Sequence, residues 1–184
     1  MKQPKHAHDA PVPGRRLVLL RHAKAEPGKG SVPDAERSLA PNGRKQASRV
    51  GMALTAAGLV PDRTLVSTAL RTRQTWELAR RHLGGSQDLP FELCPQLYAA
   101  SVSDVLDLVR TVDPAVRTLL VIGHEPTMAA TAAHLADKAS DDAALAQVRV
   151  GVPTATFSVL SAVDVPWRKW GKKSATLVRV GRPS

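Results

Sequence analysis

Short runs of large aliphatic residues recur along this chain and predict the strands of a buried sheet. Residues 17–20 form one such run and residues 118–122 another, and both are too short for an ordinary helix. An almost continuous apolar run is typical of a strand that is covered on both faces, as in a parallel sheet. Weaker patterns predict further strands at residues 64–66, 91–93, 154–160 and 175–180.

Apolar residues at helical spacing predict helices between these strands. Pro41 suits a first helical position, and the pattern that follows it ends at Gly58. The dipeptide Ser67-Thr68 is a candidate cap for a second helix, which is expected to continue to about Leu83. Two later helices are expected, at residues 101–112 and 126–136. The first opens with a Ser-x-x-Asp capping signal and the second with proline, and a loop is expected at residues 137–142.

The alternation of strands and helices predicts an α/β fold. We expect a three-layer α/β/α sandwich with right-handed crossovers and a largely parallel central sheet. The chain has 184 residues, of which 43% are hydrophobic, and this suits one substantial core. We therefore predict a single domain over residues 15–184. Residues 1–14 contain several prolines and two histidines, a composition that favours a mobile tail over a metal site.

The formal net charge of +10 at pH 7 indicates an attraction to anions. Phosphorylated substrates, nucleic acid and acidic partners all fit this charge. Part of the excess lies near the C-terminus, where we interpret it as a solvated surface in preference to a dedicated binding patch. The basic residues of this stretch are Arg168, Lys169, Lys172, Lys173, Arg179 and Arg182.

The single cysteine and the hydropathy pattern indicate the compartment. Cys94 has no partner for an internal disulfide, and one thiol is too few for a zinc–thiolate cluster. Apolar runs stay well below the length of a membrane span, and residues 1–14 lack the apolar core of a secretion signal. The sequence thus predicts a cytoplasmic protein with no membrane partner, no metal and no cofactor.

Polar residues follow three of the predicted strands. Arg21 and His22 end the first strand. Ser67 leads from a second strand toward Arg71, and His124 follows a third. Ligands of open α/β sheets bind at the carboxyl ends of the strands, so these side chains are placed to meet in one pocket. Taken singly, each has an ordinary structural explanation, as a surface charge, a helix cap or a satisfied buried polar group.

Four segments follow one another along the chain, and together they are far more specific. They are Arg21-His22-Ala23-Lys24-Ala25, then Asp34-Ala35-Glu36-Arg37-Ser38-Leu39 with Gly43-Arg44, then Ser67-Thr68-Ala69-Leu70-Arg71-Thr72-Arg73-Gln74-Thr75, and then Val121-Ile122-Gly123-His124-Glu125-Pro126. In this order they resemble the histidine phosphatase superfamily, and within it the small phosphohistidine phosphatases of the SixA type. The resemblance covers about residues 17–160.

The resemblance implies a metal-independent phosphatase that works through a phosphohistidine intermediate. His22 would attack phosphorus and carry the phosphoryl group until water releases it. Arg21 and Arg71 would bind the nonbridging oxygens, and His124 would donate a hydrogen bond to the transferring group. Weaker phosphate-binding candidates, for which a solvated or structural role is equally open, are Lys24, Arg37 and Ser67.

The chain departs from the family pattern in two places. Many members supply an acid between the second and third motifs to protonate the leaving oxygen, whereas Glu92 is one candidate here and is as readily a surface residue. A missing acid favours a phosphoramidate substrate, whose leaving nitrogen can already be protonated, over an alkyl phosphate. Glu125 stands where the family often has asparagine, and we expect its carboxylate to point away from the phosphate pocket.

Phosphohistidine in a protein is the predicted substrate. The spacing of the motifs leaves little room for a large covering insertion, which suggests a site open to a protein side chain. One alternative is a phosphatase of a small phosphorylated metabolite or nucleotide. Another is a non-catalytic module that binds anions, with nucleic acid as a less favoured partner. The presence of both histidines and both arginines favours the enzyme.

Overall fold

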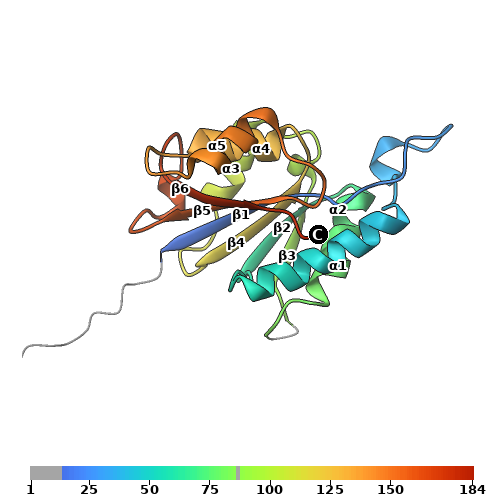
Figure 1. Ribbon diagram of the computed structural model, residues 1–184, viewed down its shortest axis with the longest axis horizontal. Helices are drawn as coiled ribbons and strands as arrows, with labels where there is room; N and C mark the ends of the chain where they lie inside the picture. The colour runs from blue at the N-terminus through green and yellow to red at the C-terminus, as the bar shows by residue number, and fades with distance from the viewer. Residues whose placement is uncertain (1–13, 86–87) are drawn as a thin grey trace, which may run out of the picture.

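One sheet lies between two layers of helices in the computed structural model, which describes residues 14–85 and 88–184 (Figure 1). Helices α1 and α2 cover one face of the sheet, and α3, α4 and α5 cover the other. This arrangement confirms the predicted three-layer α/β/α sandwich. The helices are α1 (Pro41–Ala56), α2 (Leu70–Arg80), α3 (Val102–Arg110), α4 (Thr127–Leu135) and α5 (Asp142–Val150).

The sheet has six strands in the order β3-β2-β4-β1-β5-β6. The first four strands of the chain are parallel to one another, whereas β5 is antiparallel to both of its neighbours. The sheet is therefore mixed, but β6 runs in the same direction as β1 to β4 and only β5 is reversed, so the expectation of a largely parallel sheet is confirmed. The strands are β1 (Arg15–Arg21), β2 (Arg63–Ser67), β3 (Phe91–Cys94), β4 (Thr118–Gly123), β5 (Phe157–Ala162) and β6 (Thr176–Gly181).

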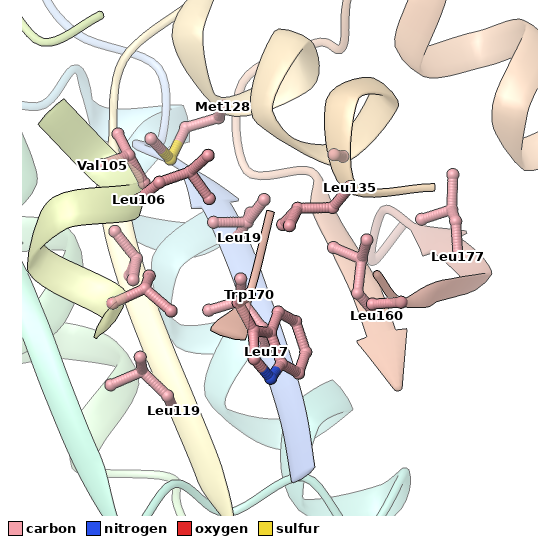
Figure 2. Close-up of a cluster of buried hydrophobic side chains, with 14 of the residues drawn as sticks. Leu17, Leu19, Val105, Leu106, Leu119, Met128, Leu135, Leu160, Trp170 and Leu177 are labelled. Carbon is pink, nitrogen blue, oxygen red and sulfur yellow. The ribbon is translucent and has the colours of Figure 1, made fainter. Parts of the chain in front are cut away.

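Strand β1 is apolar along its whole centre because helices pack on both of its faces. Leu17 and Leu19 lie in the cluster under α3, α4 and α5, and Val18 and Leu20 lie in the cluster under α1 and α2. All four side chains are at most 1% exposed. Figure 2 shows part of the first cluster, in which Trp170 lies among leucines from the strands and helices. Burial on two sides explains why this strand has no polar–apolar alternation.

The helix starts follow the sequence in one case and differ from it in another. Ser101 caps α3 as predicted, because its Oγ accepts a hydrogen bond from the Asp104 amide and the Asp104 carboxylate accepts one from the Ser101 amide. The predicted Ser-Thr cap of α2 is wrong. This helix begins after Ala69, with no side-chain cap, and ends at Arg80. Ser67 is instead the last residue of β2, and its hydroxyl contacts the ring of His124.

Helix α5 follows the expected loop at residues 137–142, and the sequence pattern did not predict it. Asp141 caps this helix, since its Oδ1 accepts a hydrogen bond from the Ala144 amide at 2.8 Å. Of its nine residues only Ala144 and Val148 are buried, which is too few for a clear helical pattern. The helix ends at Gly151, whose φ of 117° is a conformation that favours glycine.

The remaining sequence expectations concern the chain as a whole. Apart from Gly14, the expected mobile tail lies outside the described residues. The single domain over residues 15–184 stays a prediction, as does the cytoplasmic location. Within the part of the chain that the structure describes, no helix has both the length and the apolar character needed to cross a membrane.

Trp170 offers a test of the packing under α3, α4 and α5. Its ring is fully buried, and its centroid lies 4.8 Å from that of Trp167. Trp170→Ala should lower the free energy of unfolding by about 3–5 kcal/mol, because the truncated side chain leaves a cavity. Denaturant titration measures this loss. The control is Val150→Ala, at a side chain 92% exposed, which should change stability by less than about 0.5 kcal/mol. A Trp170→Ala protein as stable as the parent would contradict the packing described.

Candidate active site

The carboxyl ends of neighbouring strands bring the two predicted histidines together. β1 and β4 pair in parallel, with Arg21 opposite Gly123. The next residue of each strand is a histidine, so His22 and His124 leave the sheet side by side. Their ring centroids are 5.3 Å apart, and the ring planes make an angle of 57°. Parallel pairing therefore joins residues that are far apart in the sequence.

A cavity of about 320 Å³ opens at this edge of the sheet. The structure places six of the seven predicted site residues on its walls, and the seventh, Ser67, is fully buried and touches His124. The catalytic and binding roles of these residues remain predictions. No group of three or more His, Cys, Asp or Glu side chains in residues 14–85 and 88–184 is arranged to hold a metal. The predicted residues on the walls are Arg21, His22, Lys24, Arg37, Arg71 and His124.

His22 is held in the form that suits a nucleophile. Its side chain is buried, and its Nδ1 lies 2.7 Å from the Ala23 carbonyl oxygen. A carbonyl oxygen only accepts hydrogen bonds, so Nδ1 carries the proton and Nε2 keeps its lone pair. Burial, helped by the charges of Arg71 and Arg21 and opposed by the hydrogen bond to the carbonyl, lowers the pKa of His22 to about 4. The ring is thus neutral near pH 7, with Nε2 free to attack.

His124 is paired with the Ser67 hydroxyl. The distance from Ser67 Oγ to His124 Nε2 is 2.7 Å, and His124 Nδ1 lies 3.5 Å from Arg71 Nη2. Burial lowers the pKa of His124 to about 3, with His22 and Arg71 adding to the effect. A hydroxyl can donate as well as accept, so Ser67 supports either neutral tautomer of the ring. Arginine only donates, so in this structure His124 Nδ1 accepts from Arg71, and the proton of His124 sits on Nε2, which donates to Ser67.

Both arginines are oriented through one part of the guanidinium and keep other donors free. Arg21 Nη1 donates to the Val152 carbonyl at 2.8 Å. Arg71 Nη1 donates to the main-chain oxygen of Asp34 at 2.7 Å, and Arg71 Nη2 donates to the Asp34 carboxylate at 3.0 Å. In both arginines Nε is buried and has no hydrogen-bond partner within the described chain. Both guanidinium groups line the cavity, and a fixed cation with several N–H groups matches the oxygens of a phosphoryl group.

Asp34 is a site residue to which the sequence analysis assigned no role. It begins the short 3-10 helix η1 (Asp34–Glu36). Its Oδ2 accepts hydrogen bonds from Tyr98 at 2.6 Å and from Arg71, and its Oδ1 accepts one from Arg37 Nε at 2.9 Å. The hydrogen bond from Tyr98 and the contacts with the two arginines hold the pKa of Asp34 well below its usual range. Asp34 is therefore ionised and does not act as a proton donor.

Tyr98 is the second site residue that the sequence alone did not indicate. Besides its hydrogen bond to Asp34, its ring lies edge-on to His124, with centroids 5.6 Å apart. The only sequence signal for Asp34 was its place in the second motif, and Tyr98 gave none, because both act through partners distant in the chain.

The two glutamates of the sequence analysis have different outcomes. Glu92 lies on β3, where it pairs with Arg63 at 2.7 Å and borders a separate cavity of about 570 Å³. The structure therefore favours its interpretation as a surface residue, and it does not reach the histidines. Glu125 lines the site cavity, so the expectation that it points away is wrong in part. Its oxygens accept hydrogen bonds from the amides of Ala129 and Val152, and these donors compensate its charge.

Comparisons with known proteins agree with this geometry. Residues 17–108 match the family model of the histidine phosphatase superfamily, branch 1, and the chain belongs to this superfamily. A protein of Mycobacterium tuberculosis (strain H37Rv), described as uncharacterised, is 39% identical over 142 residues, which are 77% of this chain and 85% of that protein.

Two solved structures are similar over almost their whole length. A candidate phosphohistidine phosphatase SixA from Nakamurella multipartitia has 31% identity and a TM-score of 0.80, and the match covers 94% of this chain and 98% of that one. A candidate SixA from Agrobacterium tumefaciens has 27% identity and a TM-score of 0.76, covering 92% and 99%. These matches confirm the resemblance to the SixA type and support phosphatase activity.

Arg71 is expected to be a principal phosphate ligand. Arg71→Ala should weaken inhibition by inorganic phosphate about tenfold or more, because charged hydrogen bonds to the anion are lost. Inhibition constants measured with a phenyl phosphate substrate test this. The matched control is Arg73→Ala, since Arg73 is exposed on the same helix and has the same charge. An unchanged phosphate affinity in Arg71→Ala would remove this residue from the binding site.

The lowered pKa values of the two histidines predict an unusual titration. The rings should stay neutral as the pH falls, with His22 gaining its proton at about pH 4 and His124 at about pH 3, well below the ordinary 6.5. Imidazole resonances followed by NMR, assigned with the His22→Ala and His124→Ala variants, report this directly. In Arg71→Ala both midpoints should move upward, because a cation that opposes protonation is gone. Midpoints near 6.5 in the parent protein would contradict the described burial.

Proposed function

We propose that this chain is a metal-independent phosphatase that hydrolyses phosphohistidine in a protein through a phosphoryl intermediate on His22. The observation that carries the proposal is the pair of imidazoles, with Nε2 of His22 unprotonated and two arginine side chains lining the same cavity. The superfamily match supports the phosphatase chemistry, and the similarity to SixA candidates supports the substrate.

In the first step His22 Nε2 uses its lone pair to form a bond to phosphorus. The bond from phosphorus to the leaving atom breaks, and its electron pair stays with the leaving group. Arg21 and Arg71 offer positive donors to the nonbridging oxygens, where charge is concentrated, and these donors are already in place before the reaction. Splitting the displacement into two steps avoids a single difficult attack by water.

In the second step water attacks the phosphoryl group on His22. Phosphorus bonds to the water oxygen, the electron pair of the P–N bond returns to Nε2, and phosphate leaves with the proton balance completed by solvent. When a phosphoryl oxygen takes the place of Arg71 beside Nδ1, Ser67 can donate to Nε2, and His124 with its proton on Nδ1 would donate to that oxygen in both steps. The Ser67–His124 pair thus supplies a neutral hydrogen-bond donor beside two cationic ones.

The substrate is argued from the acids near the cavity. Asp34 is ionised, Glu125 is held by two backbone amides, and Glu92 lies elsewhere. An alkoxide leaving group requires a proton from a general acid. The nitrogen of a phosphoramidate can leave without one when the imidazole is already protonated on its other nitrogen. A phosphorylated histidine side chain therefore suits this site better than a sugar phosphate.

Trapping the phosphoenzyme tests the proposal. Brief incubation with a histidine-phosphorylated protein should transfer phosphate to the chain in a linkage that is acid-labile and alkali-stable, as a phosphoramidate is. His22→Ala should fold normally, form no adduct and have no turnover. His82→Ala is the control, because His82 is an exposed histidine outside the cavity.

Other outcomes point to the alternatives. An acid-stable adduct, or full activity of His22→Ala, would contradict the nucleophile. Turnover of small phosphate esters with none of phosphohistidine would favour a metabolite phosphatase. Salt-dependent binding of nucleic acid without any turnover would indicate a binding module.

A further inference from the structure

The leaving group of this reaction has to point toward the mouth of the cavity. In a displacement at phosphorus the attacking and leaving atoms lie on opposite sides of the phosphorus atom. His22 is 8% exposed and lies at the buried side of the cavity. The leaving group therefore faces solvent, where the side chains at the rim meet it.

Asp34 provides an ionised carboxylate next to this cavity, bonded to two of the side chains that line it. Its side chain is 53% exposed, yet it is bonded to Arg37 and Arg71, which both line the cavity. Three described donors reach it, namely Arg37 on Oδ1 and Arg71 and Tyr98 on Oδ2. A carboxylate has about four lone-pair positions, so a further donor has room on Oδ1.

The charges that face Asp34 come from every element packed against it. Arg71 approaches from α2, Arg37 from the end of η1, and Tyr98 from the segment after β3, while His124 lies within electrostatic reach from the end of β4. The hydrogen bond from Tyr98 and the two arginines together keep the carboxylate ionised, and Tyr98 does so without a charge of its own. A new N–H donor thus meets an oxygen that accepts but has no proton to give.

On the basis of the proposed function, we propose that Asp34 selects for phosphohistidine by accepting a hydrogen bond from the free ring N–H of the leaving imidazole. The ring of a phosphorylated imidazole carries a positive charge when its other nitrogen is protonated, and a carboxylate stabilises that charge. An ester leaving group develops negative charge instead, and the same carboxylate repels it. Asp34 would therefore both favour the one substrate and disfavour the other.

The step balances without an outside acid. His22 Nε2 bonds to phosphorus, the P–N bond of the substrate breaks, and its electron pair stays on the substrate nitrogen. The imidazole leaves neutral, because it keeps the proton on its other nitrogen, the one bonded to Asp34. By favouring the charged ring, Asp34 keeps the bound substrate protonated to a higher pH than in water.

The variant Asp34→Asn tests this assignment, because it removes the charge at nearly constant size. The quantity measured is kcat/KM for a histidine-phosphorylated peptide divided by kcat/KM for phenyl phosphate. We expect the ratio to fall about tenfold or more, the loss expected for one charge-assisted hydrogen bond. If the substitution also displaced Arg71, kcat/KM would fall for both substrates, and this common loss would cancel in the ratio. Glu36→Gln is the matched control, because Glu36 is an exposed acid of the same short helix, and the ratio should stay within about twofold of the parent value.

The pH profile separates recognition from a purely structural role. In Asp34→Asn the alkaline fall in phosphohistidine turnover should begin at a lower pH than in the parent, whereas the phenyl phosphate profile should not show this shift. An unchanged ratio and an unchanged alkaline limb, in a protein that does hydrolyse phosphohistidine, would overturn the role of Asp34 and leave the proposed function standing. Failure of the parent protein to hydrolyse phosphohistidine at all would overturn both.

Discussion

The parallel pairing of β1 with β4 is the constraint on which the site depends. Both strands are buried on both faces, so their register is determined by packing as well as by hydrogen bonds. A shift of one residue would turn every leucine of β1 to the other helix layer and separate the two histidines. Gly123 adds a further restriction, because a Cβ there would lie 2.8 Å from Met128 Cε at the start of α4. A larger residue before His124 would require the end of the Met128 side chain to shift.

Burial and positive charge act together on the two imidazoles. Either effect alone favours the neutral ring, and here Arg21 and Arg71 stand beside rings that are already largely removed from water. The same arginines would attract a phosphoryl group, so one set of charges serves binding and keeps the nucleophile unprotonated. The nearby acids do not cancel this effect, because Asp34 is tied to arginines and Glu125 to backbone amides.

The sequence was sufficient for features that local patterns encode. The apolar runs of β1 and β4, the capping box at Ser101 and the polar residues at strand ends follow from a few neighbouring residues each. Features that depend on contacts between distant residues could not be predicted from the sequence. Asp34 gains its role from Arg71 and Tyr98, 37 and 64 residues away, and no local pattern signals such contacts. Helix α5 was missed because so few of its side chains are buried.

The main chain of Val152 lies two residues after the end of α5, and both its N–H and its carbonyl form hydrogen bonds. Its N–H donates to Glu125, and its carbonyl accepts from Arg21. Val152 contributes only main-chain atoms to these two hydrogen bonds, and the side chains of Glu125 and Arg21 supply the other atoms. Side-chain substitutions at Val152 would therefore reveal little about how its main chain holds Arg21. Insertions or deletions between α5 and β5, which displace the backbone itself, would release Arg21.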